Sequence, residues 1–405
     1  MITEKHDSRS PAELSGLTSF DFQSRTRLIF GAGCVQRVGE LARELPAKRI
    51  LLVTDAGIVA AGHAESVREN LEGENLVVFT FDEVLVNPTT RCVDRCLQFA
   101  RENQIDAIIG LGGGSSMDTA KGCNFLLTNG GEMKDYWGVG KATKPMLPFI
   151  AIPTTAGTGS ECQSAALIAD EVTHQKMACL DPKAAARIAL LDPALTISQP
   201  AQVTSRTGVD AIAHAIETAV TKKRNPLSMM YSREAFRLMA ANFPTVLKNP
   251  LDLEARGKML LGAAFAGTAI ENSMLGAAHS AANPLTAHFG IIHGQAVGIM
   301  LPHVIRFNGE EPEVQQIYAD LAKLAGISTA PETQARWLAL IEWLFSILKQ
   351  AAIPWSLAEC EIDPAKIPDL AAEASAQWTA NFNPRPVTKA DFVGLYEKAF
   401  CRERP

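Results

Sequence analysis

Short apolar runs alternate with amphipathic stretches along the first half of the chain, up to about Pro193. The stretch 92–103 is typical of the amphipathic segments, because its apolar residues recur at the spacing of one helix face. Strands that alternate with helices predict a mostly parallel sheet with helices on both faces. Four apolar runs predict its buried strands: 49–55, 76–81, 107–111 and 149–152.

Long helical patterns dominate the second half, from about Thr204, and no segment in that half has the pattern of a strand. Residues 1–20 are polar without periodicity, which predicts a flexible tail. We therefore expect a tail over 1–20, an α/β domain over 21–199 and an all-α domain over 200–405. The predicted helices of the last domain are 208–221, 228–242, 253–273, 312–325 and 332–352.

The chain has 405 residues, of which 47% are hydrophobic and 20% are charged, as is usual for a globular protein with a large core. A formal net charge of −6 argues against nucleic acid and anionic membranes as main partners. No apolar run reaches the ~18 residues of a membrane span, and we see no signal peptide. Eight cysteines without a Cys-x-x-Cys pair favour free thiols, so we expect a cytoplasmic protein.

The strand predicted at 107–111 leads directly into three glycines, 112–114, and a helix follows. Glycines permit a tight turn and let backbone amides approach an anion, which a helix N-terminus also favours. Ser115 and Asp118 have the spacing of a capping box at the start of this helix. The loop therefore indicates a phosphate site, although a plain strand–turn–helix would contain the same glycines.

Two further segments would suit a nucleotide. Asp55 ends an earlier strand, where its carboxylate could accept a bond from an adenosine ribose and would repel a 2′-phosphate. Residues 153–161 follow the fourth strand and are rich in hydroxyl groups and glycine, which suits contacts to pyrophosphate or ribose. Each signal alone is weak, because aspartates in turns and glycine-rich loops are common.

Asp210 and His214 lie four positions apart in a predicted helix, so both side chains point the same way. Glu217 follows three positions later on roughly the same side. A carboxylate and an imidazole at this spacing can chelate one metal ion. Such a pair more often forms a cap or a buried hydrogen bond, so the spacing alone does not decide for a metal.

A second cluster contains His279 and His293, which one straight helix would separate by about 21 Å. Pro284, Gly290 and Gly294 would allow the chain to leave the helix and return. A helix–loop–helix would then bring both imidazoles to the first pair. One carboxylate and three imidazoles suit Fe²⁺ or Zn²⁺, with Mn²⁺, Co²⁺ or Ni²⁺ as alternatives.

Taken together, these motifs resemble those of the iron-containing (group III) alcohol dehydrogenases, relatives of lactaldehyde reductase and 1,3-propanediol dehydrogenase. The resemblance extends from about Thr26 to Phe400. It implies an α/β dinucleotide-binding domain, an all-α metal-binding domain and catalysis in the cleft between them. The segments that carry it are 53–55, 87–89, 112–121, 152–161, 210–217, 279–294, 383–385 and 395–396.

The resemblance also implies roles for individual residues. It implies that NAD, in preference to NADP, binds beside Asp55, and that Fe²⁺ or another divalent ion binds in the helical domain. The implied metal ligands are Asp210, His214, His279 and His293. The implied cofactor-binding residues are Asp55, Asn87, Gly113, Gly114, Ser115, Asp118, Thr154, Thr155, Thr158 and Lys176.

One residue of the expected catalytic site departs from the family pattern. Asn283 stands four positions after His279, where relatives usually have a histidine. An amide does not titrate near neutral pH, so Asn283 could hydrogen-bond a substrate or a water but could not relay a proton. We expect the proton to leave through water and a cofactor ribose hydroxyl.

The predicted function is NAD-linked, metal-dependent oxidation of a small alcohol, or reduction of an aldehyde, by a homo-oligomer. Three alternatives stay open: metal-free reduction of the maleylacetate reductase type, hydride transfer between a hydroxyacid and an oxoacid, and a non-enzymic role in binding or assembly. The intact ligand set argues against the first alternative, and the intact ligand set and glycine loop together argue against the last.

Overall fold

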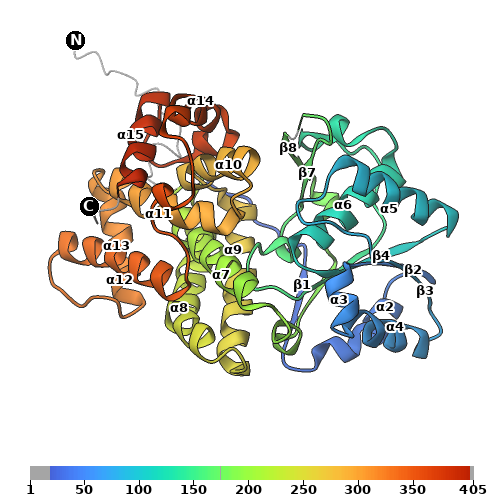
Figure 1. The fold of residues 1–405 in the computed structure, drawn as a ribbon. Helices are drawn as coiled ribbons and strands as arrows, with labels where there is room; N and C mark the ends of the chain where they lie inside the picture. The colour runs from blue at the N-terminus through green and yellow to red at the C-terminus, as the bar shows by residue number, and fades with distance from the viewer. Residues whose placement is uncertain (1–18, 174, 402–405) are drawn as a thin grey trace, which may run out of the picture.

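The computed structural model describes residues 19–173 and 175–401. The flexible tail expected at 1–20 lies outside the described residues, except for its last two positions. An α/β half is followed by a helical half, which is the predicted fold class (Figure 1). No helix in the described part of the chain is long and apolar enough to cross a membrane.

A six-stranded sheet lies at the centre of the first half, with strand order β1-β9-β6-β4-β2-β3. Neighbouring strands are parallel throughout, and Ile108 of β4 pairs with Leu51 on one side and Phe149 on the other. From β2 the chain continues to β3 on one side of the sheet and then to β4 on the other side. In α/β sheets, the carboxyl ends of the two strands at such a switch point form a crevice that binds ligands. The strands are β1 (Arg27–Phe30), β2 (Arg49–Val53), β3 (Val77–Phe81), β4 (Ala107–Gly112), β6 (Phe149–Pro153) and β9 (Ile188–Leu191).

Helices cover both faces of this sheet, as β2 illustrates. Ile50 and Leu52 belong to a core with residues of α2 (Val38–Arg43) and α4 (His63–Gly73). Leu51 and Val53 point the other way, into a core with residues of α5 (Thr90–Glu102) and α6 (Gly114–Asn129). A strand that is buried on both faces has a continuous run of apolar residues, and for this reason β2 could be predicted from the sequence.

The four expected strands are confirmed to within two residues at each end. The sequence did not indicate β1, β9 or a second, three-stranded sheet. In that small sheet β8 pairs with β7 in antiparallel fashion and with β5 in parallel. Short, alanine-containing strands carry weak local signals and depend on pairing for their stability. The small sheet consists of β5 (Gly138–Val139), β7 (Ala165–Ala169) and β8 (Lys176–Leu180).

From Ala201 onward the described residues form helices and no strand, as expected. Local signals set several helix starts; Asn225, for example, accepts bonds from two amides at the start of α8 and is followed by Pro226. The helices are α7 (Ala201–Thr218), α8 (Pro226–Lys248), α9 (Leu253–Ser273), α10 (Ala277–Phe289), α11 (His293–Asn308), α12 (Pro312–Leu324), α13 (Thr333–Gln350), α14 (Ile367–Ala376) and α15 (Lys389–Phe400).

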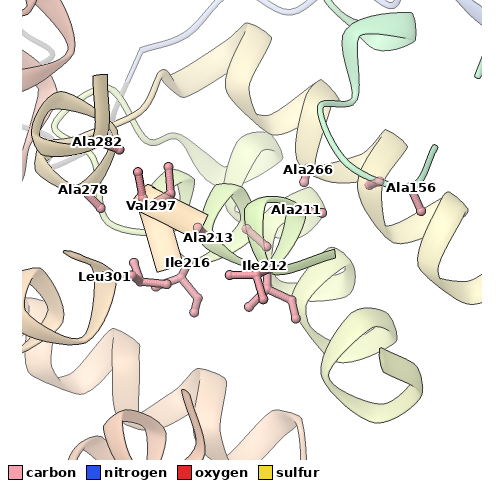
Figure 2. Packing of buried hydrophobic residues seen from close by; sticks show 14 of the residues in the cluster. Ala156, Ala211, Ile212, Ala213, Ile216, Ala266, Ala278, Ala282, Val297 and Leu301 are labelled. Atoms are coloured by element: carbon pink, nitrogen blue, oxygen red, sulfur yellow. The ribbon is translucent and has the colours of Figure 1, made fainter. Parts of the chain in front are cut away.

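The hydrophobic core runs from the helical half into the loop after β6. Figure 2 shows Ala213 of α7 near Val297 of α11. Ala156, in the loop after β6, belongs to the same buried cluster as Ala211 and Ala266 (Figure 2). Small side chains let these segments approach closely, so the loop is held against the helices by apolar packing.

Candidate active site

The first glycine loop joins the carboxyl end of β4 to α6. Gly112 has φ +144°, and a Cβ there would lie 2.4 Å from Ser116 Oγ, so only glycine fits. Helix α6 begins at Gly114, and no side chain of the described residues caps it. The expected capping box of Ser115 and Asp118 is therefore wrong, because Ser115 lies inside the first turn. The uncapped first turn suits an anion.

The second loop, residues 153–161, follows β6 and packs against the first. The Thr154 N–H donates to the Gly112 carbonyl over 2.9 Å. The structure thus brings both loops together, and with them five of the residues expected to bind the cofactor. A Cβ added to Gly113 would lie 3.3 Å from Thr155 Cγ2, and a Cβ added to Gly114 would lie 2.8 Å from Thr158 Cγ2.

Asp55 and Asn87 lie beside the first glycine loop. Asp55 caps α3 (Ala56–Ala60), and its Oδ1 accepts two backbone amides over 2.9 and 3.1 Å. Its Oδ2 lies 3.4 Å from the place that a Cβ on Gly112 would occupy. The Asn87 N–H donates to Ser115 Oγ over 3.3 Å. One oxygen of Asp55 therefore caps α3, while the other faces the first glycine loop.

Asp118 is turned into the protein. Its side chain accepts a hydrogen bond from Ser160 Oγ over 3.1 Å. Burial raises the pKa of Asp118 to about 6, against the opposing charges of Lys121 and Lys176. Lys176 is exposed on β8, and its charge adds to the burial that lowers the pKa of His293. The charge of Lys176 is thus felt both by Asp118, near the first glycine loop, and by His293, in the histidine cluster.

Asp210 of α7 lies among three histidines. Its Oδ1 is 3.6 Å from His214 Nε2, 3.5 Å from His279 Nε2 and 3.9 Å from His293 Nε2. One ligand atom each from Asp210, His279 and His293 all lie within 4.8 Å of one another. His214 stacks on His279 with ring centroids 4.8 Å apart. Helices α7, α10 and α11 thus bring the four expected metal ligands together.

The turn between α10 and α11 brings two of the histidines to α7. Gly290, with φ +64°, follows the end of α10, and His293 begins α11. The expected helix–loop–helix is confirmed, but Pro284 and Gly294 lie inside the helices and do not break them. A Cβ on Gly294 would lie 2.1 Å from the Arg206 carbonyl oxygen, so glycine permits α11 to touch α7.

Glu217 holds His279 from the side away from Asp210. Its carboxylate hydrogen-bonds His279 Nδ1 and accepts the Ala278 N–H over 2.8 Å. Because Nδ1 is engaged, Nε2 of His279 is the atom that faces Asp210. A carboxylate of this kind fixes the tautomer of a ligating histidine. Glu217 is not among the site residues expected from the sequence, although its spacing from His214 was a usable signal.

The electrostatics of the cluster favour a cation. Burial alone would raise the pKa of Asp210, but the three histidines hold it below its usual range. Burial lowers the pKa of His293 to about 3, whereas Glu217 and Asp210 overcome burial and raise the pKa of His279 to about 9. Asp210 Oδ1 and His279 Nε2 are buried without a hydrogen-bond partner among residues 19–173 and 175–401. Because buried polar atoms are seldom unpaired, this donor set fits a divalent metal.

Asn283 lies one turn after His279 in α10 and is partly buried. Its Nδ2 donates to Gln377 Oε1 over 3.1 Å. The partner is a second amide, so this hydrogen bond gives Asn283 no route for a proton.

Two family profiles match almost the whole chain. Residues 25–193 match the profile of the iron-containing alcohol dehydrogenases, and residues 204–400 match that of the C-terminal part of the Fe-containing alcohol dehydrogenase family. The chain belongs to the iron-containing alcohol dehydrogenase family. Membership confirms the resemblance, the fold class and the expectation of an enzyme that oxidises alcohols or reduces aldehydes.

Similar proteins support this membership. The NAD-dependent methanol dehydrogenase of Bacillus methanolicus is 34% identical, over 92% of this chain and 97% of its own. The 1,3-propanediol dehydrogenase of Klebsiella pneumoniae is 31% identical, over 94% and 99%. A solved 1,3-propanediol oxidoreductase has a TM-score of 0.91 at 30% identity, and the match covers 95% of this chain and 100% of that one. The expected metal and nicotinamide cofactor are thereby confirmed at the level of the family.

Proposed function

We propose that this protein is an NAD-linked, metal-dependent dehydrogenase that interconverts a small alcohol and its aldehyde. The observation that carries the proposal is the buried cluster on α7, α10 and α11. There Asp210, His279 and His293 offer ligand atoms within 4.8 Å of one another, and two of those atoms, Asp210 Oδ1 and His279 Nε2, lack a hydrogen-bond partner among the described residues. The second glycine loop belongs to the same core as α7 and also touches the first loop.

Asp210, His214, His279 and His293 would hold Fe²⁺, and Zn²⁺ suits the same donors. A bound divalent cation would supply Lewis acidity toward the substrate oxygen. Asp210 supplies the negative charge, since its pKa is held below the usual range. Glu217 keeps Nδ1 of His279 engaged, which leaves Nε2 for ligation.

The two loops would bind the dinucleotide. The first amides of α6, at Gly113, Gly114 and Ser115, would receive the pyrophosphate, because an uncapped helix start favours anions. Asp55 Oδ2 would accept a hydrogen bond from the adenosine ribose. Asp118 accepts a hydrogen bond from Ser160 and would influence dinucleotide binding through the loop that contains Ser160. The remaining proposed contacts are Asn87, Thr154, Thr155, Thr158 and Lys176.

Asn283 would orient the substrate or a water, one turn from His279. Its amide cannot exchange a proton near neutral pH, so the proton would leave through water and a ribose hydroxyl. An Asn283→His variant is expected to change the pH dependence of turnover. An unchanged pH–rate profile would contradict this part of the proposal.

The proposal also covers the setting of the enzyme. We propose a cytoplasmic homo-oligomer without nucleic-acid or membrane partners. Supporting this, the eight cysteines are free thiols, and the net charge is −6. Free thiols are usual in a reducing compartment.

The decisive experiment follows the absorbance of reduced nicotinamide with a panel of short alcohols, diols and hydroxy acids, assayed in both directions. We expect activity with Fe²⁺ or Zn²⁺ that falls to background after chelation and in an Asp210→Asn variant. Activity that survives complete metal removal would instead indicate the maleylacetate reductase type. A cofactor that stays bound through purification and passes hydride between two substrates would indicate a transhydrogenase.

A second variant tests the cofactor preference. Asp55→Ser keeps an oxygen that can cap α3 but removes the charge beside the ribose, so stability is retained. We expect the ratio of kcat/KM for NAD to that for NADP to fall by about tenfold or more, because a 2′-phosphate is no longer repelled. An unchanged ratio would exclude Asp55 from this role.

A further inference from the structure

Lys121 is a buried lysine on the second turn of α6, with 1% of its surface exposed. Its ammonium nitrogen donates to four oxygens: Ser160 O at 2.6 Å, Gln163 O at 2.8 Å, Ser160 Oγ at 2.9 Å and Ala165 O at 3.0 Å. None of these four acceptors is a carboxylate. Four acceptors around one nitrogen require its three N–H groups, so the amine is protonated although burial lowers its pKa.

All four oxygens belong to one segment, residues 160–165, which joins the second glycine loop to β7. Three of them are backbone carbonyls, and that of Ser160 also accepts the Gln163 N–H over 3.2 Å, which closes a single 3₁₀ turn. A buried carbonyl that loses a hydrogen-bond donor is destabilised, so loss of the ammonium would favour opening of this segment toward water. Lys121 therefore adds hydrogen bonds to four oxygens of this one segment.

The same segment is tied to the second glycine loop. The Ser160 N–H donates to Thr158 Oγ1 over 3.2 Å, and Gln163 Nε2 donates to the Thr158 carbonyl over 2.7 Å. Thr158 is the residue whose methyl group would contact a Cβ on Gly114 at 2.8 Å. The position of Thr158 beside the first glycine loop thus depends on residues that Lys121 holds.

On its other side this loop touches the helices of the second half. A Cβ on Gly157 would lie 2.7 Å from Thr207 Cβ on α7, the helix that carries Asp210. A Cβ on Gly159 would lie 2.6 Å from the Ala263 carbonyl oxygen on α9. Residues 157–165 therefore connect the proposed dinucleotide site to the helices that surround the metal cluster.

We propose that Lys121 is a positioning residue whose ammonium clamps residues 157–165 in the shape that binds the dinucleotide. The clamp works as an internal cation, replacing hydration of three carbonyls by one fixed charge. Ser160 links it to Asp118, which lies three positions before Lys121 on α6. The identity of the ligand rests on the proposed function, whereas the clamp itself is a property of the fold.

Three variants of the full-length protein test the clamp. Lys121→Met removes the donors but keeps the length of the side chain, and Ser160→Ala removes one acceptor and the link to Asp118. Lys183→Met is the control for loss of a lysine that donates to a backbone carbonyl outside both loops: Lys183 donates to the Ala142 carbonyl over 3.0 Å and to Asp181 Oδ1 over 3.2 Å. The readouts are amide hydrogen exchange across the chain and the dissociation constant of NADH on metal-free protein.

For Lys121→Met we expect faster exchange at 157–165 with unchanged exchange in β2 and β4, and NADH binding weaker by at least about tenfold. Ser160→Ala should show the same pattern with a smaller effect, about threefold, and Lys183→Met should match the wild type. If Lys121→Met does not fold, the Ser160→Ala result decides.

Unchanged exchange at 157–165 and unchanged NADH affinity would overturn the clamp. So would exchange that rises equally throughout the chain, because that would show a general loss of stability. The two proposals fail differently: a wild-type protein that does not bind NADH refutes the proposed function, whereas the exchange measurement still tests the clamp.

Discussion

Glu217 and Glu373 each pair with a histidine of α10, but in different surroundings. Both side chains of the Glu217–His279 pair are 4% exposed. In the Glu373–His288 pair the side chains are 47% and 50% exposed, and His288 Nε2 lies 2.8 Å from Glu373 Oε2. An exposed ion pair contributes little because water screens it, whereas a buried carboxylate orients the ring that it holds.

Glu217→Gln is expected to weaken metal binding by about 10- to 100-fold, since the amide no longer fixes the His279 tautomer by charge. The measurement is competition between the protein and a chelator for Zn²⁺. Glu373→Gln, the same change in the exposed pair, should leave the affinity unaltered. Equal affinities of the two variants would remove Glu217 from the metal site.

His303 is a buried histidine outside the metal cluster, on α11, with its ring centroid 6.1 Å from that of Phe345. Neither ring nitrogen has a hydrogen-bond partner among the described residues. Burial, with a smaller effect of Arg306 and Lys398, lowers its pKa from 6.5 to about 4. Below pH 6.5 the unfolded chain therefore takes up a proton that the folded chain refuses, so stability falls as the pH falls toward 4.

His303→Leu should remove this dependence. As the pH is lowered from about 7 to about 5, the free energy of unfolding of the wild type should fall by about 2 kcal/mol more than that of the variant. Urea unfolding of both proteins at the two pH values measures the difference. Two parallel pH profiles would show that His303 is not held neutral in the fold.

At the scale of elements, the metal cluster depends on how closely α11 approaches α7. Gly294 lets the first turn of α11 lie against the Arg206 carbonyl, and Gly298 lies one turn later, where a Cβ would be 2.7 Å from Val209. Two glycines on one face thus form the contact surface. The histidine at the start of α11 reaches Asp210 because of this approach.

Gly294→Ala is expected to destabilise the fold by about 1–3 kcal/mol, because its Cβ meets a backbone oxygen that cannot move aside. Metal affinity should fall as well, since α11 carries His293. The control is Gly394→Ala in α15, where a Cβ has no neighbour within 4 Å; it should stabilise by about 0.5–1 kcal/mol. Thermal unfolding and metal titration measure both, and a neutral Gly294→Ala would contradict the close approach.

At the scale of the whole molecule, one hydrophobic cluster includes residues of both halves, from Leu51 in the sheet to Ala399 in α15. The proposed dinucleotide contacts come from the first half and the metal ligands from the second. Because ligands that bind only the folded chain stabilise it by mass action, a metal bound between three helices should stabilise the entire protein.

Stripping the metal with a chelator should therefore lower the unfolding midpoint, and Zn²⁺ should restore it. At a free Zn²⁺ concentration about 100 times its dissociation constant, the gain in unfolding free energy is about 2.7 kcal/mol. Asp210→Asn should lose most of this gain. A gain of equal size in Asp210→Asn would show that Zn²⁺ binds elsewhere.

Much of the fold and the site was predictable from local patterns. The apolar run of β4, the glycines after it, and the Asp210–His214 spacing depend only on neighbouring residues, and the structure has them where the pattern predicts. The capping box at Ser115 was wrong, because the N-cap is Gly113, two residues earlier. The orientation of Asp118 and the function of Lys121 gave no sequence signal, because their partners lie near residue 160.

By itself, the sequence determined the strands buried on both faces, the helical half and the types of donor available for a phosphate and a cation. These follow from hydrophobic periodicity and side-chain chemistry, which are local. Only the tertiary structure decided that α11 returns to α7, that Glu217 holds His279, and that Lys121 holds the loop between the two halves. Such contacts join segments far apart in the chain, and they form only because close packing of small residues brings those segments within a few ångströms.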